Sequence, residues 1–426
     1  MDKEVLLKQL KKDRQTLHQH PEEGWTEFFA TYYVAKRLES LGVSYRTGHG
    51  LVDPQSVMGR DEEKVRKAME RAISWGVPSE FIESLNGVTG VVAEIDTGRP
   101  GPTTACRFDM DCVCVQETGA EDHIPNQEGF ASLNPGLMHA CGHDVHTSVG
   151  LSVVKWVAEN KDKLKGKIRF IFQPAEEGCR GAYAMSCAGI VDDVDYFMGA
   201  HVGGQAKLGE IFVLTGGLLA SSKLDIEFTG QPSHAGSDPE KGRSALMAAA
   251  ACALMIGGIP RHSAGDSRVS VGTLVAGEGR NVTPVHAKMQ VETRGVVEEV
   301  NDYLESQVYQ IAKGIAMTYG VEQEVKAVGR ASTLPVSEGL VKIALEVAKT
   351  IPQVKNVQEE SRPSASEDCT HFMRRVIEKG GQAVFFLYGT QHPGHHRANF
   401  DIQPECMLFG LQMFEKMLSR LNGVEA

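Results

Sequence analysis

Short runs of β-branched and aromatic residues alternate along the chain with stretches whose apolar residues recur at helical spacing. Strands are predicted where such a run is bounded by Gly, Pro or Asp, at residues 88–97, 103–110, 167–173 and 196–202. A helix is predicted over residues 143–163, whose apolar positions are Val149, Val153, Val154 and Val157. A helix that joins two such strands is typical of a parallel crossover, so the pattern predicts an α/β fold.

A second block has a different order of elements. It runs strand, helix, strand, strand, helix, strand, at residues 223–229, 244–256, 269–276, 287–295, 300–319 and 321–328. This order is typical of the α+β ferredoxin-like, or split-βαβ, sandwich. The α/β rhythm then returns, with a helix, a strand and a terminal helix at 339–349, 383–387 and from Pro404 onward. The pattern therefore predicts a larger α/β domain, residues 1–213 and 330–426, that contains a smaller inserted domain, residues 214–329.

Residues 47–87 form a separate segment within the larger domain. Asp61 is placed to cap a helix, which Gly76 and Pro78 would end. The apolar residues expected on this helix are Val65, Met69, Ala72 and Ile73. We predict a small helical hairpin whose role the sequence does not define.

Length and composition restrict the class of protein. The 426 residues suffice for two or three domains, and with 42% apolar and 23% charged residues the chain resembles an ordinary globular protein. It has no apolar run of 18 residues, so we expect no membrane span. The net charge of −11 is spread along the chain without a block of Lys or Arg, so we expect no nucleic-acid partner.

Two features predict a cytoplasmic location. The nine cysteines are odd in number and lack paired Cys-x-x-Cys spacing, which fits a reducing compartment. The first residues predict an amphipathic helix without the apolar core and cleavage site of a secretory signal. Its apolar face is expected to carry Val5, Leu6, Leu10 and Leu17.

A cluster of metal-binding side chains occupies residues 138–147. Their sequence, Met-His-Ala-Cys-Gly-His-Asp-Val-His-Thr, packs three imidazoles, a thiol and a carboxylate into the eight residues from His139 to His146. These are the donors that Zn²⁺ and other borderline divalent ions prefer. Cys141 and His143 can turn toward one ion in a loop, whereas in a helix they would diverge. A lone Cys-x-His is more often a buried cysteine beside a surface histidine, but the density of donors here favours a metal site.

Adjacent carboxylates follow a predicted strand at residues 170–178, Phe-Ile-Phe-Gln-Pro-Ala-Glu-Glu-Gly. Open α/β sheets place their ligand sites at such strand ends. One of the two, Glu176 or Glu177, can bind metal while its neighbour, directed at a metal-bound water, takes the proton. The alternative is a solvated pair in a turn. Three more histidines are candidates: His201 ends the run 197–201, and His395 and His396 follow a Pro-Gly pair. Each alone would more often be structural.

Together these segments resemble the M20 metallopeptidase family, which contains carboxypeptidase G, aminoacylases and indole-acetyl-amino-acid hydrolases, and within it a branch of bacterial amidohydrolases. Further matching segments follow in order along nearly the whole chain, at residues 17–22, 109–111, 230–236, 277–282, 366–368 and 394–401. Residues 97–103, 191–197 and the 47–87 insertion carry a closer similarity to one subgroup of that branch. The resemblance implies a two-metal aminopeptidase-like catalytic domain with an inserted lid and dimerisation domain.

The resemblance also implies the ligands of two divalent ions, Mn²⁺ or Zn²⁺. Those ligands are Cys141, His143, Glu177, His201 and His396. His396 is favoured over His395, which stays the alternative, because the family ligand lies four residues before an aromatic residue, here Phe400. Cys141 stands where related enzymes use a bridging aspartate, so its thiolate is expected to contact both ions.

Further roles follow from the same resemblance. Glu176 becomes the general base, and Asp111 is expected to steady a ligand histidine. His234 corresponds to a lid histidine that reaches the active site of a second protomer and stabilises the oxyanion, which requires a dimer. Asn281 and Arg294 correspond to lid positions that bind substrate, and a guanidinium suits a free carboxylate. A solvated arginine at a strand end is the alternative for Arg294.

The expected activity is hydrolysis of the amide bond that joins an acyl or aroyl group to an amino acid. An N-acyl-amino-acid deacylase or a dipeptidase would use the same chemistry on another small molecule. A catalytically silent partner chain is also conceivable, because heteromeric members of this group pair two similar chains. Loss of the base or of a ligand would mark such a chain, and here Glu176 and all expected ligands are present. We therefore expect an enzyme, as a homodimer or as a heteromer with a homologous chain.

Overall fold

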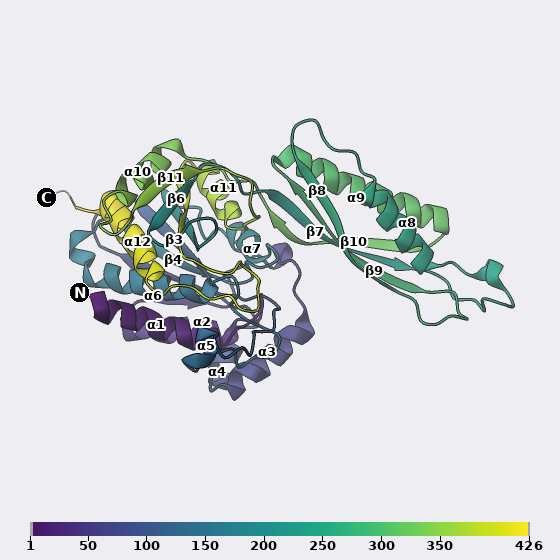
Figure 1. The fold of residues 1–426 in the computed structure, drawn as a ribbon, viewed down its shortest axis with the longest axis horizontal. Coiled ribbons are helices and arrows are strands. Elements are labelled where there is room, and N and C mark those ends of the chain that lie inside the picture. Colours follow the sequence, from purple (N-terminus) through teal and green to yellow (C-terminus); the bar gives the residue numbers. More distant parts are fainter. Residues whose placement is uncertain (1–2, 425–426) are drawn as a thin grey trace. The chain divides into compact units, whose positions relative to one another are not determined.

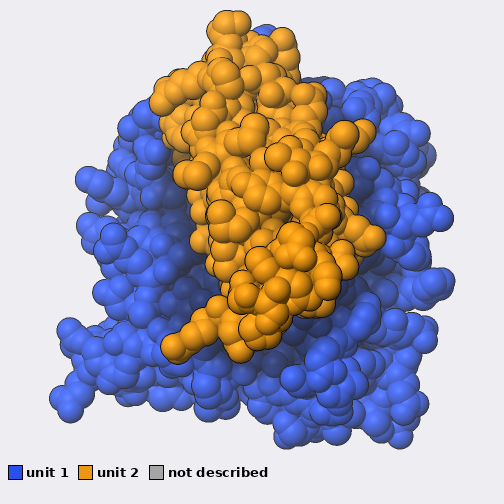
Figure 2. Space-filling model, turned by 90° about the vertical axis from the view of Figure 1, so that its right-hand side faces the viewer, with its two compact units in different colours: residues 1–216, 334–362, 368–426 blue, residues 217–333, 363–367 orange. Residues whose placement is uncertain are grey.

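The computed structural model describes residues 3–424 and divides the chain into two compact units, which Figure 2 colours separately. Unit 1 comprises Met1–Gly216, Leu334–Arg362 and Asp368–Ala426. Unit 2 comprises Gly217–Thr333 and Pro363–Glu367. The last short segment lies within the range predicted for the larger domain, and it joins unit 2 because Ala365 pairs with Leu218 in a parallel bridge.

An eight-stranded mixed sheet forms the centre of unit 1 (Figure 1). The strand order is β1 (Tyr45–Thr47), β2 (Val91–Asp96), β4 (Lys167–Gln173), β3 (Thr103–Asp109), β5 (Tyr196–Val202), β12 (Gln382–Tyr388), β6 (Glu210–Leu214) and β11 (Asn356–Glu360). The predicted strands of this domain are confirmed, whereas β1, β6 and β11 were not predicted. The four central strands β4, β3, β5 and β12 run parallel, so their carboxyl ends meet at one edge of the sheet.

Helices cover both faces of this sheet (Figure 1). On one side lie α1 (Lys3–Gln19), α2 (Phe28–Ser40), α6 (His143–Glu159), α10 (Glu338–Ala348) and α12 (Cys406–Asn422), and on the other α7 (Gly181–Cys187) and α11 (Thr370–Glu378). Ring contacts join each layer to the sheet: the centroids of Phe108 and Phe414 are 5.0 Å apart, and those of Phe197 and Phe372 are 5.7 Å apart. Short helices α5 (Ile124–Gln127) and η2 (Lys161–Lys163) lie in connections.

The apolar residues predicted on α1 and on the helix of the insertion are buried to different degrees. On α1, Leu10 and Leu17 are buried, but Val5 is 57% exposed because it lies in the first turn, beyond the core. The insertion contains η1 (Pro54–Ser56), α3 (Glu62–Ser74) and α4 (Ser79–Ser84), and Asp61 caps α3 by accepting two backbone N–H groups. Its buried residues are Val65, Ala68 and Ala72. Ile73 lies on α3 as predicted, and its side chain is 45% exposed.

Unit 2 follows the order β7 (Ala220–Thr229), α8 (Ala245–Gly257), β8 (Ser267–Ala276), β9 (His286–Gly295), α9 (Glu298–Tyr319) and β10 (Glu322–Ala331), with a short η3 (Pro239–Lys241) before α8. Its four strands pair antiparallel in the order β10-β7-β9-β8. The inner faces of α8 and α9 pack on the sheet and form a separate apolar core. Within residues 3–424, no helix combines the length and apolar character needed to cross a membrane.

Candidate metal centre

The carboxyl edge of the central sheet collects side chains from four strands. β3 ends at Asp109 and is followed by Asp111, whereas β4 leads into Glu176 and Glu177. His201 lies near the end of β5, and the loop after β12 carries His396. Helix α6 begins at this edge with His143, directly after the loop that holds Cys141. Parallel strands therefore bring together residues that are far apart in the sequence.

The five predicted ligands form two groups that share one member. The ligand atoms of Cys141, His143 and His201 all lie within 4.8 Å of one another, and so do those of Cys141, Glu177 and His396. The Cys141 Sγ is 3.4 Å from the His201 Nε2, and the His396 Nε2 is 3.2 Å from the Glu177 Oε1. A sulfur common to both groups is placed to contact two cations at once.

Hydrogen bonds orient two of the imidazoles toward this centre. The Nδ1 of His201 donates to the Val202 carbonyl at 2.8 Å, which leaves its Nε2 directed at Cys141. The Nδ1 of His143 lies 3.3 Å from Asp111, and its Nε2 is buried without a hydrogen-bond partner among residues 3–424. That orphaned nitrogen is 3.8 Å from a Glu176 oxygen. Because buried polar atoms are normally satisfied, an unpartnered imidazole nitrogen among carboxylates and a thiol fits a metal ligand.

The charges of the cluster depend on one another. Burial holds the pKa of His201 well below its usual value, so this imidazole is neutral and able to bind metal. Burial also opposes charge on His143, but Asp109 and Cys141 raise its pKa well above the usual value. Hydrogen bonds with Cys141 and Glu177 raise the pKa of His396 to about 10. A metal ion must displace these protons, so we expect metal affinity to fall as the pH falls.

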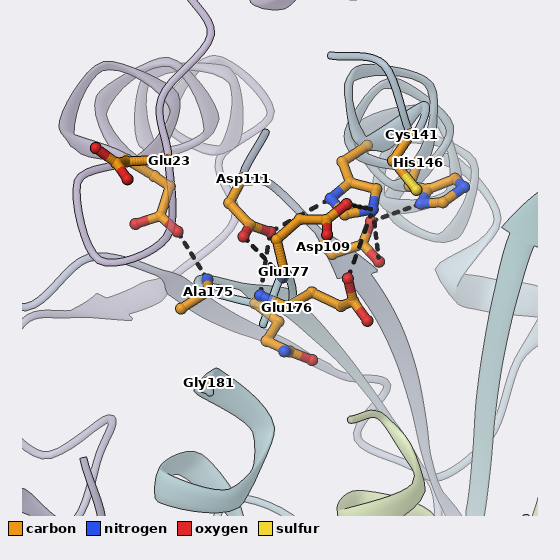
Figure 3. A network of polar contacts seen from close by, with 12 residues as sticks. Glu23, Asp109, Asp111, Cys141, His146, Ala175, Glu176, Glu177 and Gly181 are labelled. Atoms are coloured by element: carbon orange, nitrogen blue, oxygen red, sulfur yellow. Dashed lines mark hydrogen bonds and ion pairs between the residues drawn. The ribbon is translucent and has the colours of Figure 1, made fainter. Parts of the chain in front are cut away.

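Asp111 organises the turn that carries the two glutamates (Figure 3). It accepts the backbone N–H of Glu176 at 3.1 Å and that of Glu177 at 2.9 Å, in addition to its contact with His143. The preceding residue, Ala175, has a φ of 54°, and its N–H donates to the buried Glu27 at 2.7 Å. The turn is thus held from both sides, with Glu176 only 8% exposed.

The two neighbouring histidines of the last loop have different surroundings. His395 Nε2 accepts the Gly204 N–H at 3.2 Å, so its lone pair is already used. His396 faces Glu177, has a φ of 60°, and its backbone N–H donates to the Ala140 carbonyl at 2.7 Å. That bond ties the last loop to the loop of Cys141.

A supporting network behind the centre was not predicted as such. Asp109 lies 2.5 Å from the Nδ1 of His146 and 2.7 Å from Arg107, and all three side chains are buried. The other nitrogen of His146 accepts the Val202 N–H at 2.9 Å, beside His201. His146 lies three residues after His143 on α6, a spacing that places both on one helix face and offered a signal. For Arg107 the sequence offered no such signal, because this residue lies within an apolar strand.

The three residues predicted to act from the inserted domain lie in unit 2. His234 is exposed and forms an isolated bridge with Val282, the residue after Asn281, which is also exposed. Arg294 lies near the far end of β9 from these two, and Glu292 engages its guanidinium through two bonds of 3.0 Å. The structure therefore brings His234 and Asn281 near one another and places Arg294 apart.

The sequence matches the family model described as peptidase family M20/M25/M40 over residues 105–420. It is 44% identical to a Haemophilus influenzae homolog of one chain of p-aminobenzoyl-glutamate hydrolase, with 97% of this chain and 99% of the relative covered. Indole-3-acetyl-aspartic acid hydrolase of Enterobacter agglomerans is 42% identical, with 96% and 94% covered. Among solved structures, an aminobenzoyl-glutamate utilization protein from Klebsiella pneumoniae is 36% identical with a TM-score of 0.83, and 98% of each chain is covered.

Proposed function

The chain belongs to peptidase family M20/M25/M40, and we propose that it cleaves the amide bond between an aromatic acyl group and an acidic amino acid. It is a metal-dependent amidohydrolase of N-acyl amino acid conjugates. The names of two relatives support the finer assignment, since p-aminobenzoyl-glutamate and indole-3-acetyl-aspartic acid each join an aromatic acyl group to a dicarboxylic amino acid. The proposed substrate is p-aminobenzoyl-glutamate or a similar conjugate.

One observation carries the proposal of a two-metal centre, namely that Cys141 is shared by two groups of three ligands. One divalent cation would be held by Cys141, His143 and His201, and a second by Cys141, Glu177 and His396. The mixture of thiolate, imidazole and carboxylate donors suits Zn²⁺, and Mn²⁺ is the other candidate. The unpartnered Nε2 of His143 supports this assignment.

When bound, such cations supply Lewis-acid activation of a water molecule and of the scissile carbonyl. Glu176 takes the proton from the attacking water and passes it to the leaving nitrogen, a transfer that a positioned carboxylate typically accelerates by ~10²–10⁴-fold. Asp111 holds the backbone of Glu176 and the ring of His143, so it positions both the base and a ligand.

A homodimer formed through unit 2 completes the proposal. Helix α8 and the edge strand β8 expose large apolar side chains: Met247, Leu254, Met255, Leu274 and Val275, with Leu254 79% and Val275 72% exposed. An exposed apolar helix beside an unpaired strand edge favours association with a second copy. His234 would then serve the partner's site as an oxyanion donor, and Asn281 would contact the substrate. The remaining candidate is a heteromer with a homologous chain.

The cysteines support a place in the cytoplasm. None of the nine, all of which lie within residues 3–424, forms a disulfide, and those at positions 106, 112, 141, 179, 252, 369 and 406 are buried. Thiols outside disulfides are typical of a reducing compartment.

A substrate panel tests the proposed activity. The metal-free protein is reconstituted with Mn²⁺ or Zn²⁺ and assayed on p-aminobenzoyl-glutamate, indole-3-acetyl-aspartate, N-acetyl amino acids and dipeptides, with Glu176→Gln as the matched inactive control. We expect the highest kcat/KM on the aromatic conjugates. Preference for acetyl amino acids or dipeptides would redirect the assignment to a deacylase or dipeptidase. Absence of turnover on every compound with both metals bound would favour the catalytically silent partner chain.

Sedimentation tests the dimer separately. Leu254→Glu combined with Val275→Lys is expected to give a folded monomer, whereas the exposed control change Lys326→Glu on β10 should leave the dimer intact. A wild-type protein that sediments as a monomer at micromolar concentration would contradict this part of the proposal.

A further inference from the structure

We propose that Arg180 binds the side-chain carboxylate of the substrate's acidic amino acid and that the 47–87 insertion holds this arginine in place. The inference rests on the proposed function, which it deepens by assigning a residue to the acidic group of the conjugate. Arg180 lies three residues after Glu177, in the same turn that carries the general base Glu176. Its side chain is hydrogen-bonded to this turn, because its Nε donates to the Glu177 carbonyl.

Two backbone carbonyls fix the guanidinium of Arg180. Its Nε donates to the Glu177 carbonyl at 2.9 Å, and its Nη1 donates to the Gly59 carbonyl, in the insertion, at 3.0 Å. Within residues 3–424, no carboxylate lies within ion-pair distance of it, although the side chain is only partly exposed. Since a guanidinium offers five N–H donors, most of its capacity is left for a ligand.

Other enclosed arginines of unit 1 are paired differently. Arg14, Arg107 and Arg169 each form ion pairs with two carboxylates. Arg180 is held by neutral oxygens instead, so its positive charge is not compensated by its neighbours. A fixed and uncompensated guanidinium is suited to grip a carboxylate through two parallel hydrogen bonds.

The chain also keeps space for this side chain. A Cβ added to Gly24 would lie 2.4 Å from the Arg180 Nη2 and 2.9 Å from backbone of Ala175. Glycine at position 24 therefore leaves room for Nη2, the third nitrogen of the guanidinium.

The insertion is anchored around the same place. The Trp25 Nε1 donates to the Met58 carbonyl at 2.8 Å, next to the Gly59 carbonyl that holds Arg180. Lys64 forms an ion pair with Glu23 at 2.8 Å. These contacts make the insertion a fixed support, which gives a chemical role to a segment whose purpose the sequence left open.

Arg294, the residue expected from the sequence to bind a substrate carboxylate, is occupied by Glu292 within unit 2. A conjugate of glutamate or aspartate carries two carboxylates, so the two arginines are not exclusive. Arg180 is the one that lies in the turn of Glu176 and Glu177 and is held by neutral carbonyl oxygens rather than by a carboxylate.

A matched pair of substrates tests the inference. Wild type and Arg180→Met are compared on p-aminobenzoyl-glutamate and on p-aminobenzoyl-glutamine, an isostere in which an amide replaces the side-chain carboxylate and the α-carboxylate is kept. We expect Arg180→Met to lower kcat/KM for the glutamate conjugate by about 10- to 100-fold, mainly through KM, the loss typical of one charge-assisted contact. The glutamine conjugate should change by less than about threefold. Arg66→Met, an exposed arginine on α3 of the insertion, is the control and should change neither.

The outcomes separate this inference from the proposed function. Equal losses on both conjugates would show that Arg180 is structural and would overturn the inference while the function stands. If wild type cleaves neither conjugate, calorimetry on Glu176→Gln still compares their dissociation constants, and failure to bind either refutes the proposed substrate itself. Thermal melting and metal content show whether Arg180→Met is folded. If it is not, the inference is tested with Arg180→Lys on the same two conjugates, and with the preference of wild type for the glutamate conjugate over the glutamine conjugate. Wild type without at least about a tenfold preference for the glutamate conjugate would overturn the inference.

Discussion

Replacing Asp111 with Asn should weaken metal binding without removing any ligand. One Asp111 oxygen accepts from the His143 ring and the Glu176 backbone at 3.3 and 3.1 Å, and the other accepts from the Glu177 backbone at 2.9 Å. In its best orientation an asparagine keeps the first oxygen and turns its NH₂ group toward the Glu177 N–H. Two donors then face each other, and one hydrogen bond to a charged group, worth about 1.5–3 kcal/mol, is lost.

That loss predicts a metal dissociation constant raised by about 10- to 100-fold, the range typical for residues that orient a ligand. The constant is measured by competition with a chromophoric chelator at fixed pH. Activity should recover in large part at saturating metal, because the ligands and Glu176 remain. Asp192→Asn is the control, since Asp192 pairs with Arg375 on the surface. An unchanged dissociation constant in Asp111→Asn, beside an unchanged control, would refute the positioning role.

Three other predictions concern the centre, the fold and the dimer. Cys141→Ala should lose at least one ion per chain, as measured by elemental analysis, because its sulfur is shared by both ligand groups, and two tightly retained ions would remove it from the centre. Burial lowers the pKa of His18, but hydrogen bonds with two buried carboxylates have the larger combined effect and raise it to about 9. The protonated ring therefore contributes to the free energy of unfolding below about pH 6.5, and this contribution is lost as the pH rises through about 9. The stability difference between wild type and His18→Gln, from urea titrations, should shrink by on the order of 3 kcal/mol over that window, and a constant difference would contradict the assignment. Mixing His234→Ala with Glu176→Gln should restore about a quarter of wild-type activity if His234 serves the site of its partner, since half of the dimers are mixed and each of these has one intact site of two. If subunits exchange between the dimers and no activity returns, His234 serves only its own chain.

Local motifs predicted the residues of the centre that lie close together in the sequence. Cys141 and His143 came from a dense cluster, and Glu176 and Glu177 from a strand end. The distant donors His201 and His396 required the resemblance, because a single histidine after a strand carries little information. Their convergence depends on four parallel strands that end at one edge.

Features decided by tertiary contact were not predicted. The sequence identified α3 but not which of its apolar residues would be covered: Val65 and Ala72 are buried, whereas Ile73 is 45% exposed. The strands β6 and β11 lie away from the centre of the sheet and are short, which weakens their pattern. Arg107 and Arg180 acquire their surroundings from segments far along the chain, and no local spacing marks such contacts.

The central claim is that Glu176 acts as the general base beside a two-metal centre and is not itself a ligand of either metal. The direct test is kcat of Glu176→Gln measured on protein shown by elemental analysis to contain as much metal as wild type. We expect two divalent ions per chain in both proteins, and a kcat lower by ~10²–10⁴-fold in the variant, because an amide cannot accept the proton of water. Near wild-type kcat in the metal-replete variant would contradict the account.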